Sequence, residues 1–179
     1  MEKETVIINL LGGPGTGKST MMASLFSYLK SIGIDCEMCP EFAKELVWEN
    51  RMETFNDELY LFAKQNHRMF RLNRKVDVVI TDRPLIMSIP YNRLYHGYDL
   101  AYERLVIQTF DSYNNINIFL NRVKPFQASG RNEDEDTAKL IDCNIKSMLE
   151  EYGYEYIEVD SLTENVELIY NSIKSQIKN

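Results

Sequence analysis

The sequence of 179 residues lacks the features that mark membrane and secreted proteins. No apolar run approaches the ~18–20 residues that a membrane-spanning helix needs, so we expect no transmembrane segment. The charged start, Met1–Thr5, does not fit a secretory signal peptide. Cysteine is scarce, and an odd count of three in a chain of this size favours a reducing compartment over a disulfide framework. We therefore expect a cytoplasmic protein.

The sequence also lacks an excess of basic residues. Lys and Arg total 20 against 27 Asp and Glu, which gives a net charge of −7. Proteins that bind nucleic acids or anionic membranes usually carry a basic surface, so this charge disfavours both partners. Internal repeats and Pro/Gly/Ser-rich linkers are missing as well, which favours a single domain over residues 1–179. The sequence leaves open whether the chain acts alone or as a homodimer.

Short apolar runs typical of buried strands alternate with amphipathic helical patterns. This alternation predicts βαβ units and an α/β fold with five parallel strands flanked by helices. The expected strands are residues 5–11, 34–39, 76–81, 115–120 and 154–159. The expected helices are residues 18–32, 41–51, 55–74 with Thr54 as N-cap, 84–112 with a break at 95–98, a stripe from Ala138 to Tyr152, and 163–177.

A glycine-rich segment, GGPGTGKS at residues 12–19, fits the pattern G-x-x-x-x-G-K-[ST]. A buried strand precedes it and a helix follows, so backbone N–H groups and the helix N-terminus can bind phosphates there. We expect Lys18 at the β- and γ-phosphates and the Ser19 hydroxyl at Mg²⁺. A plain glycine-rich connection would not require this Lys–Ser pair. The predicted ATP and Mg²⁺ site comprises Gly12, Gly13, Pro14, Gly15, Thr16, Gly17, Lys18, Ser19 and Thr20.

The strand expected at residues 76–81 is followed by Asp82 and Arg83. An acid at the carboxyl end of a parallel strand beside the phosphate loop can hold Mg²⁺, directly or through water. The alternative for Asp82 is a helix cap. Arg83 could hold an acceptor or the transferred phosphoryl group, and its alternative is a structural ion pair.

In their order along the chain, these motifs resemble small P-loop kinases of nucleosides and nucleotides. The resemblance is strongest to deoxynucleoside kinases and to the NadR-like nicotinamide riboside kinase family, often labelled AAA-type ATPase domains. It implies a P-loop NTPase three-layer sandwich with a lid loop at about residues 122–136. The matching positions are the phosphate loop, Pro40-Glu41 followed by Trp48, Gln65, Asp82-Arg83 and the loop 122–136. Pro84 departs from the family pattern, which has a hydroxyl residue there, and this leaves the acceptor's identity open.

The resemblance also implies roles for individual residues. Glu41 would accept the proton of the attacking hydroxyl, with a first-turn Glu favoured by the helix dipole as the alternative. Gln65 would pair with the edge of the acceptor's base, with an amide bonded to the backbone as the alternative. Arg122 and Arg131 would reach the transferred phosphoryl group from the lid, with solvated surface as their alternative.

Together these features predict an ATP- and Mg²⁺-dependent phosphotransferase acting on a nucleoside, a nucleotide or a related ribosylated small molecule. Its expected catalytic residues are Lys18, Glu41, Asp82, Arg83, Arg122 and Arg131. Its expected acceptor-binding residues are Glu41, Gln65 and Arg83. A second hypothesis is a kinase of a polynucleotide end or of a hydroxyl on a modified base, which the acidic charge disfavours. A third is a non-kinase ATP-binding or ATPase switch module.

Two further questions concern the acceptor. An acceptor that already carries a phosphate would require additional arginines, and the sequence offers Arg51, Arg68, Arg71 and Arg93 without placing them. Tyrosines could also line an acceptor site. For Tyr91, Tyr95 and Tyr98 we expect packing between helices instead.

Overall fold

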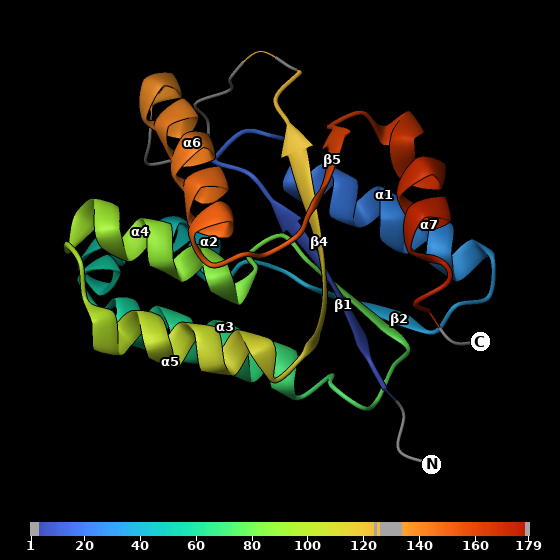
Figure 1. Cartoon of the computed structure of the whole chain (residues 1–179), viewed down its shortest axis with the longest axis horizontal. Helices are drawn as coiled ribbons and strands as arrows, with labels where there is room; N and C mark the ends of the chain where they lie inside the picture. The colour runs from blue at the N-terminus through green and yellow to red at the C-terminus, as the bar shows by residue number, and fades with distance from the viewer. Residues whose placement is uncertain (1–3, 124, 126–133, 178–179) are drawn as a thin grey trace.

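The structure is a computed structural model that describes residues 4–123, 125 and 134–177. Five parallel strands form one sheet in the order β2-β3-β1-β4-β5 (Figure 1). The strands are β1 Val6–Leu11, β2 Cys36–Cys39, β3 Val78–Thr81, β4 Asn114–Asn121 and β5 Ile157–Asp160. Every residue of β1 is buried, because the sheet is covered on both faces. The predicted α/β fold is confirmed.

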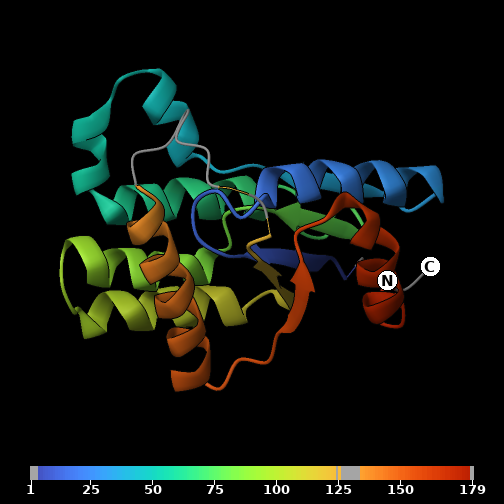
Figure 2. The same cartoon turned by 90° about the horizontal axis from the view of Figure 1, so that it is seen from above.

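Helices lie on both faces of the sheet (Figure 2). They are α1 Lys18–Ser31, α2 Ala43–Trp48, α3 Glu58–Phe70, α4 Ser88–Tyr95, α5 Leu100–Asp111, α6 Glu135–Glu151 and α7 Val166–Ile173. Ile8 of β1 packs in one apolar cluster with residues of α1 and α7, whereas Ile7 packs in another with residues of α3 to α6. Because side chains alternate along a strand, the central strand β1 contributes apolar residues to the core on both faces of the sheet. None of the helices in the described part of the chain is both long and apolar enough to cross a bilayer.

Several expected boundaries were wrong, among them the strand expected at 154–159, which is β5 Ile157–Asp160, and the helix expected at 163–177, which is α7 Val166–Ile173. The helix expected at 55–74 begins at Glu58, and its N-cap is Asp57, whose carboxylate accepts the Tyr60 N–H at 2.9 Å. Thr54 lies instead in a 3₁₀ turn, Met52–Asn56. Ile32, the last residue of the helix expected at 18–32, lies just beyond the end of α1 and is 44% exposed. The helix expected at 41–51 is shortened to α2.

Candidate active site

The predicted phosphate loop connects β1 to α1 at the carboxyl edge of the sheet. Gly17 is the N-cap of α1 and has φ +94°, a conformation that glycine adopts without steric cost. A Cβ atom at Gly17 would also collide with the Ser161 hydroxyl, which follows β5. The positive φ and the close neighbour together explain why glycine stands at the entrance of this helix.

The Lys18 ammonium lies within the loop. Its Nζ donates to the carbonyl oxygens of Gly12 at 2.7 Å and Gly13 at 2.8 Å. Burial lowers the pKa of Lys18, although the nearby carboxylates of Glu41 and Asp82 oppose this shift. The lysine is thus held beside the backbone amides that the motif predicts to bind phosphate.

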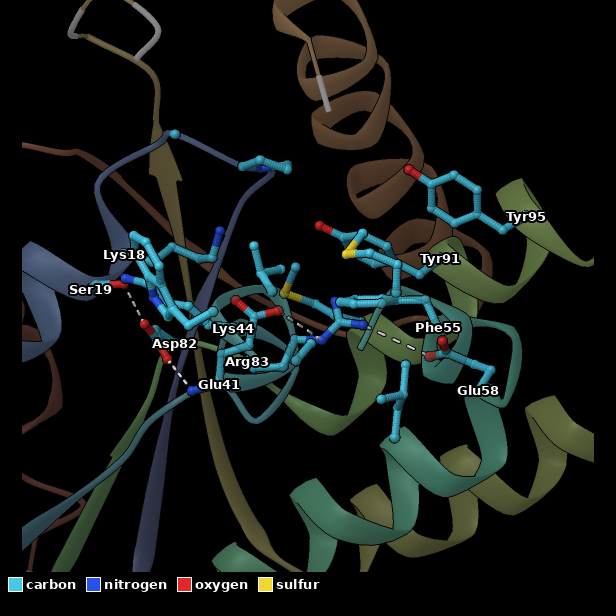
Figure 3. A pocket seen from close by; sticks show the side chains of 18 of the residues that line it. Lys18, Ser19, Glu41, Lys44, Phe55, Glu58, Asp82, Arg83, Tyr91 and Tyr95 are labelled. Atoms are coloured by element: carbon cyan, nitrogen blue, oxygen red, sulfur yellow. Dashed lines mark hydrogen bonds and ion pairs between the residues drawn. The ribbon is translucent and has the colours of Figure 1, made fainter. Parts of the chain in front are cut away.

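Asp82 joins the phosphate loop to the end of β2. The Ser19 hydroxyl donates to Asp82 Oδ2 at 2.5 Å, and the backbone N–H of Glu41 donates to Oδ1 at 2.9 Å (Figure 3). Mg²⁺ binds oxygen ligands such as hydroxyl and carboxylate groups. In proteins it is usually coordinated by one or two such side chains together with the phosphates of a substrate. Among the described residues, no cluster of three or more His, Cys, Asp or Glu side chains could form a protein-only metal cage. Ser19 and Asp82 therefore fit a Mg²⁺–nucleotide site.

Arg83 is a buried cation between two carboxylates. Its Nε lies 3.7 Å from Glu41 Oε1, and its Nη2 lies 3.8 Å from Glu58 Oε1. The guanidinium also stacks on Tyr91, 4.0 Å from the ring centre. Burial raises the pKa of Glu58, and Arg83 opposes that shift. Arg83 therefore forms the structural ion pairs that were the alternative to an acceptor-binding role. The same side chain also lines the cavity described next.

One cavity of about 690 Å³ contains both halves of this site (Figure 3). At one end it is lined by the phosphate loop with Lys18 and Ser19, and further on by α2, α3 and α4. Its walls include the aromatic side chains Trp48, Phe55, Tyr91 and Tyr95. Tyr91 packs against the core cluster of α3 to α6 as expected and also lines the cavity, and Tyr95 lines the cavity beside it. For Tyr98 the expected packing between helices is wrong, because its side chain is 67% exposed.

Arg122, expected at the transferred phosphoryl group, braces the phosphate loop from outside the cavity. Its Nη1 donates to the Pro14 carbonyl at 2.9 Å, and its Nη2 pairs with Asp142 Oδ2 at 2.9 Å. The other Asp142 oxygen accepts the Gly13 N–H at 2.5 Å. Arg131 and most of the expected lid lie outside the described residues.

Gln65 lies on the buried face of α3 with Phe62 and Met69, as the helical spacing predicts. Its amide, however, is occupied by the backbone. Oε1 accepts the Phe42 N–H at 2.9 Å, and Nε2 donates to the Pro40 carbonyl at 3.4 Å. Gln65 does not line the cavity. The structure thus favours the alternative reading, in which this amide is bonded to the backbone.

Two residues of the site escaped the sequence analysis. Glu58 carries no motif, although its place in the first turn after an Asp cap marks the start of a helix. Asp142 lies 129 residues from its partner Gly13, and nothing local in the sequence connects them. The sequence offered one signal for Asp142: this charged residue lies on the apolar face of α6, one residue after the buried Ile141.

The sheet order, the loop between β1 and α1, and the Ser19–Asp82 pair define a P-loop NTPase-like fold. A domain of this class implies nucleotide binding. The chain belongs to a family described as an AAA domain, which matches residues 7–167. Comparison with curated protein sequences finds no match.

Solved structures share this architecture at low sequence identity. A NadR protein in complex with NR has a TM-score of 0.73 at 15% identity and covers 98% of this chain, which spans only 53% of that protein. Deoxyadenosine kinase from M. mycoides with bound dCTP has a TM-score of 0.58 at 19% identity, with 94% of this chain and 99% of that one covered. Thymidylate kinase from Ehrlichia chaffeensis has a TM-score of 0.63 at 16% identity, with 96% and 99% covered. These similarities establish the kinase-like fold.

Proposed function

We propose that the protein is an ATP- and Mg²⁺-dependent phosphotransferase that acts on a nucleoside, a nucleotide or a related ribosylated small molecule. The observation that carries this proposal is the continuous cavity. The phosphate loop lines one half of this cavity, and Glu41 and Arg83 line the same cavity. A nucleotide switch needs the first half of this cavity, whereas a group-transfer enzyme needs both halves. The kinases among the structural neighbours support the same class.

Each residue then has a role in positioning, which is the main source of catalysis in phosphoryl transfer. The loop amides and Lys18 hold the ATP phosphates. Ser19 and Asp82 hold Mg²⁺, which when bound neutralises charge on the phosphoryl group. Glu41 orients the acceptor hydroxyl and takes its proton, and Arg83 holds the acceptor.

The lid arginines have different places in this proposal. Arg122 supports the phosphate loop through Pro14 and Asp142, so it acts on ATP through the loop backbone. Arg131 keeps its predicted role at the transferred phosphoryl group. An Arg131→Ala variant is expected to lower kcat while ATP binding is retained, which separates it from Arg122.

The test is a transfer screen with ATP labelled at the γ-phosphate against nucleosides, nucleoside monophosphates and nicotinamide derivatives. Wild type should label at least one acceptor, and Glu41→Gln should lower kcat about 10²–10⁴-fold because it removes the general base. Glu49→Gln is the matched control, since Glu49 follows α2, is exposed and does not line the cavity. Lys18→Ala should lose ATP binding. ATP hydrolysis without transfer to any acceptor, or full turnover by Glu41→Gln, would contradict the proposal.

A further inference from the structure

Arg93 lies at a junction of helices and not in the cavity. It is one of four arginines that the sequence offered without placing, and none of the four is among the described residues that line the cavity. The other three lie on the surface, where two of them pair with exposed glutamates: Arg51, Arg68 and Arg71. Arg93, on α4, pairs with Glu103 of α5 and with Glu151, the last residue of α6. Its contacts therefore concern how three helices are held together.

Glu103 is a fully buried carboxylate that accepts hydrogen bonds from two side chains. Arg93 donates to it from both sides of its fork, from Nε to Oε1 at 2.7 Å and from Nη2 to Oε2 at 2.6 Å. The hydroxyl of Tyr152, the C-cap of α6, donates to Oε2 at 2.5 Å. Arg93 also donates from Nη1 to Glu151 Oε2 at 2.6 Å. Four side chains from three helices thus form one charge-assisted cluster.

This cluster fixes geometry more than it adds stability. Taking two charges out of water offsets much of what a buried ion pair gains from attraction, so replacing such a pair by apolar side chains is often neutral. Separating the two charges is different, since Glu103 would remain buried without its counter-charge. Helices α4 and α5 and the end of α6 therefore cannot move apart without a large energetic penalty.

Helix α6 contacts the phosphate loop with its N-terminal half. Asp142 accepts the Gly13 N–H at 2.5 Å, and a Cβ atom on Gly13 would lie 2.5 Å from the Ala138 carbonyl oxygen. From there α6 continues without interruption to Glu151, with one apolar face buried in the core. Rigid secondary elements of this kind can carry energetic coupling between separated sites. A shift of the C-terminal end of α6 would therefore displace the residues that contact the loop.

Helix α4 forms part of the cavity wall. Its Tyr91 and Tyr95 line the cavity, and Tyr91 stacks on the Arg83 guanidinium, 4.0 Å from the ring centre. Arg93 lies between the two tyrosines in the sequence and joins α4 to the end of α6, which lies next to α4 in both views of the fold (Figures 1 and 2). One helix thus contacts the phosphate loop directly and the cavity wall through Arg93.

We propose that α6 couples the phosphate loop to the α4 wall of the cavity, and that Arg93 and Glu103 are positioning residues that hold the far end of α6. This inference rests on the proposed function, because it takes the phosphate loop to bind ATP, and it adds a cluster of residues that does not line the cavity. Coupling between two sites is reciprocal in binding free energy. Loosening the Arg93 end of α6 should therefore weaken ATP binding at the Asp142 end.

The experiment measures the Kd of a non-hydrolysable ATP analogue with Mg²⁺ by titration calorimetry on the full chain. Arg93→Met combined with Glu103→Leu removes both charges, so that neither is left buried and unpaired. We expect this variant to raise the Kd about 5-fold or more, at the lower end of usual coupling between sites. Glu151→Gln removes only the contact at the end of α6 and should have a smaller effect in the same direction. Glu150→Gln is its matched control, since Glu150 is the exposed neighbour on α6.

A second comparison separates coupling from a general loss of stability. Asp142→Asn weakens the contact between α6 and the loop, so adding it to the Arg93 and Glu103 substitutions should give less than the sum of the two effects on the binding free energy. Urea unfolding is measured in parallel, because a merely structural cluster would lower stability and leave the Kd of the folded protein unchanged.

An unchanged Kd in the folded Arg93 and Glu103 variant, or additive effects with Asp142→Asn, overturns the inference. If that variant does not fold, Glu151→Gln alone and with Asp142→Asn decides by the same criteria. Binding of the analogue without transfer of phosphate to any acceptor refutes the proposed function and leaves the coupling standing. A wild-type protein that does not bind the analogue refutes both.

Discussion

Replacing Asp142 by Asn tests whether α6 holds the phosphate loop in place. Asp142 accepts the Gly13 N–H through one oxygen and pairs with Arg122 through the other. An asparagine can still accept the Gly13 N–H, but its amide NH₂ would then face the donors of Arg122. The substitution therefore removes the charge-assisted pair and leaves the loop contact available.

The size of the effect follows from the burial of this pair. The Arg122 and Asp142 side chains are 12% and 19% exposed, so solvent screens them little. Hydrogen bonds to charged groups contribute roughly 1.5–3 kcal/mol, and we expect Asp142→Asn to lower the free energy of unfolding by about 2 kcal/mol. In a chain of this size that corresponds to a fall in Tm of about 4–8 °C. ATP affinity should fall too, because Arg122 also holds the Pro14 carbonyl.

Urea unfolding and ATP titration calorimetry measure the two effects. Glu150→Gln removes the same charge from an exposed position of α6 and should leave both quantities unchanged. A double-mutant cycle with Arg122→Gln should give a coupling energy of about 1 kcal/mol or more. Additive effects of the two substitutions, or a Tm of Asp142→Asn equal to that of wild type, would show that the Asp142–Arg122 pair does not hold the phosphate loop in place.

Two further predictions concern the loop glycine and the thiols. Gly13→Ala should destabilise the fold by about 1–3 kcal/mol in urea unfolding, because a Cβ there would lie 2.5 Å from the backbone carbonyl oxygen of Ala138. Stability equal to that of wild type would show that α6 does not pack this closely against the loop. In thiol labelling at pH 7.5, the exposed Cys143 should react alone, since burial raises the pKa of Cys36 and Cys39 to about 11. Labelling of either buried thiol before denaturation would contradict this.

Local sequence was sufficient to predict which strands and helices form, though not where each begins and ends, and to predict the loop between β1 and α1. The loop is a contiguous segment whose glycines, Lys18 and Ser19 each have a positional meaning between a strand and a helix. The pairing of Ser19 with Asp82 could also be anticipated, because the carboxyl ends of neighbouring parallel strands meet at one edge of a sheet.

Contacts that depend on tertiary packing could not be predicted in the same way. Asp142 reaches the loop only because α6 packs against it, so closely that a Cβ on Gly13 would lie 2.5 Å from the Ala138 carbonyl. Glu58 meets Arg83 because α3 starts three residues later than the periodicity suggested, with Asp57 as its cap. The helical pattern fixed the buried face of α3 but not the residue at which the helix began.

The amide of Gln65 has a consequence for how loss-of-function variants would be interpreted. The amide donates a hydrogen bond to the carbonyl of Pro40 and accepts one from the N–H of Phe42, and these two residues flank Glu41. A variant such as Gln65→Leu would remove both hydrogen bonds and allow Glu41 to move, although Gln65 itself does not line the cavity. In a mutational screen it would imitate a defect in acceptor recognition. A crystal structure of such a variant, or rescue by a second substitution that restores the position of residues 40–42, would show that the defect lies in the position of Glu41 and not in a contact between Gln65 and the acceptor.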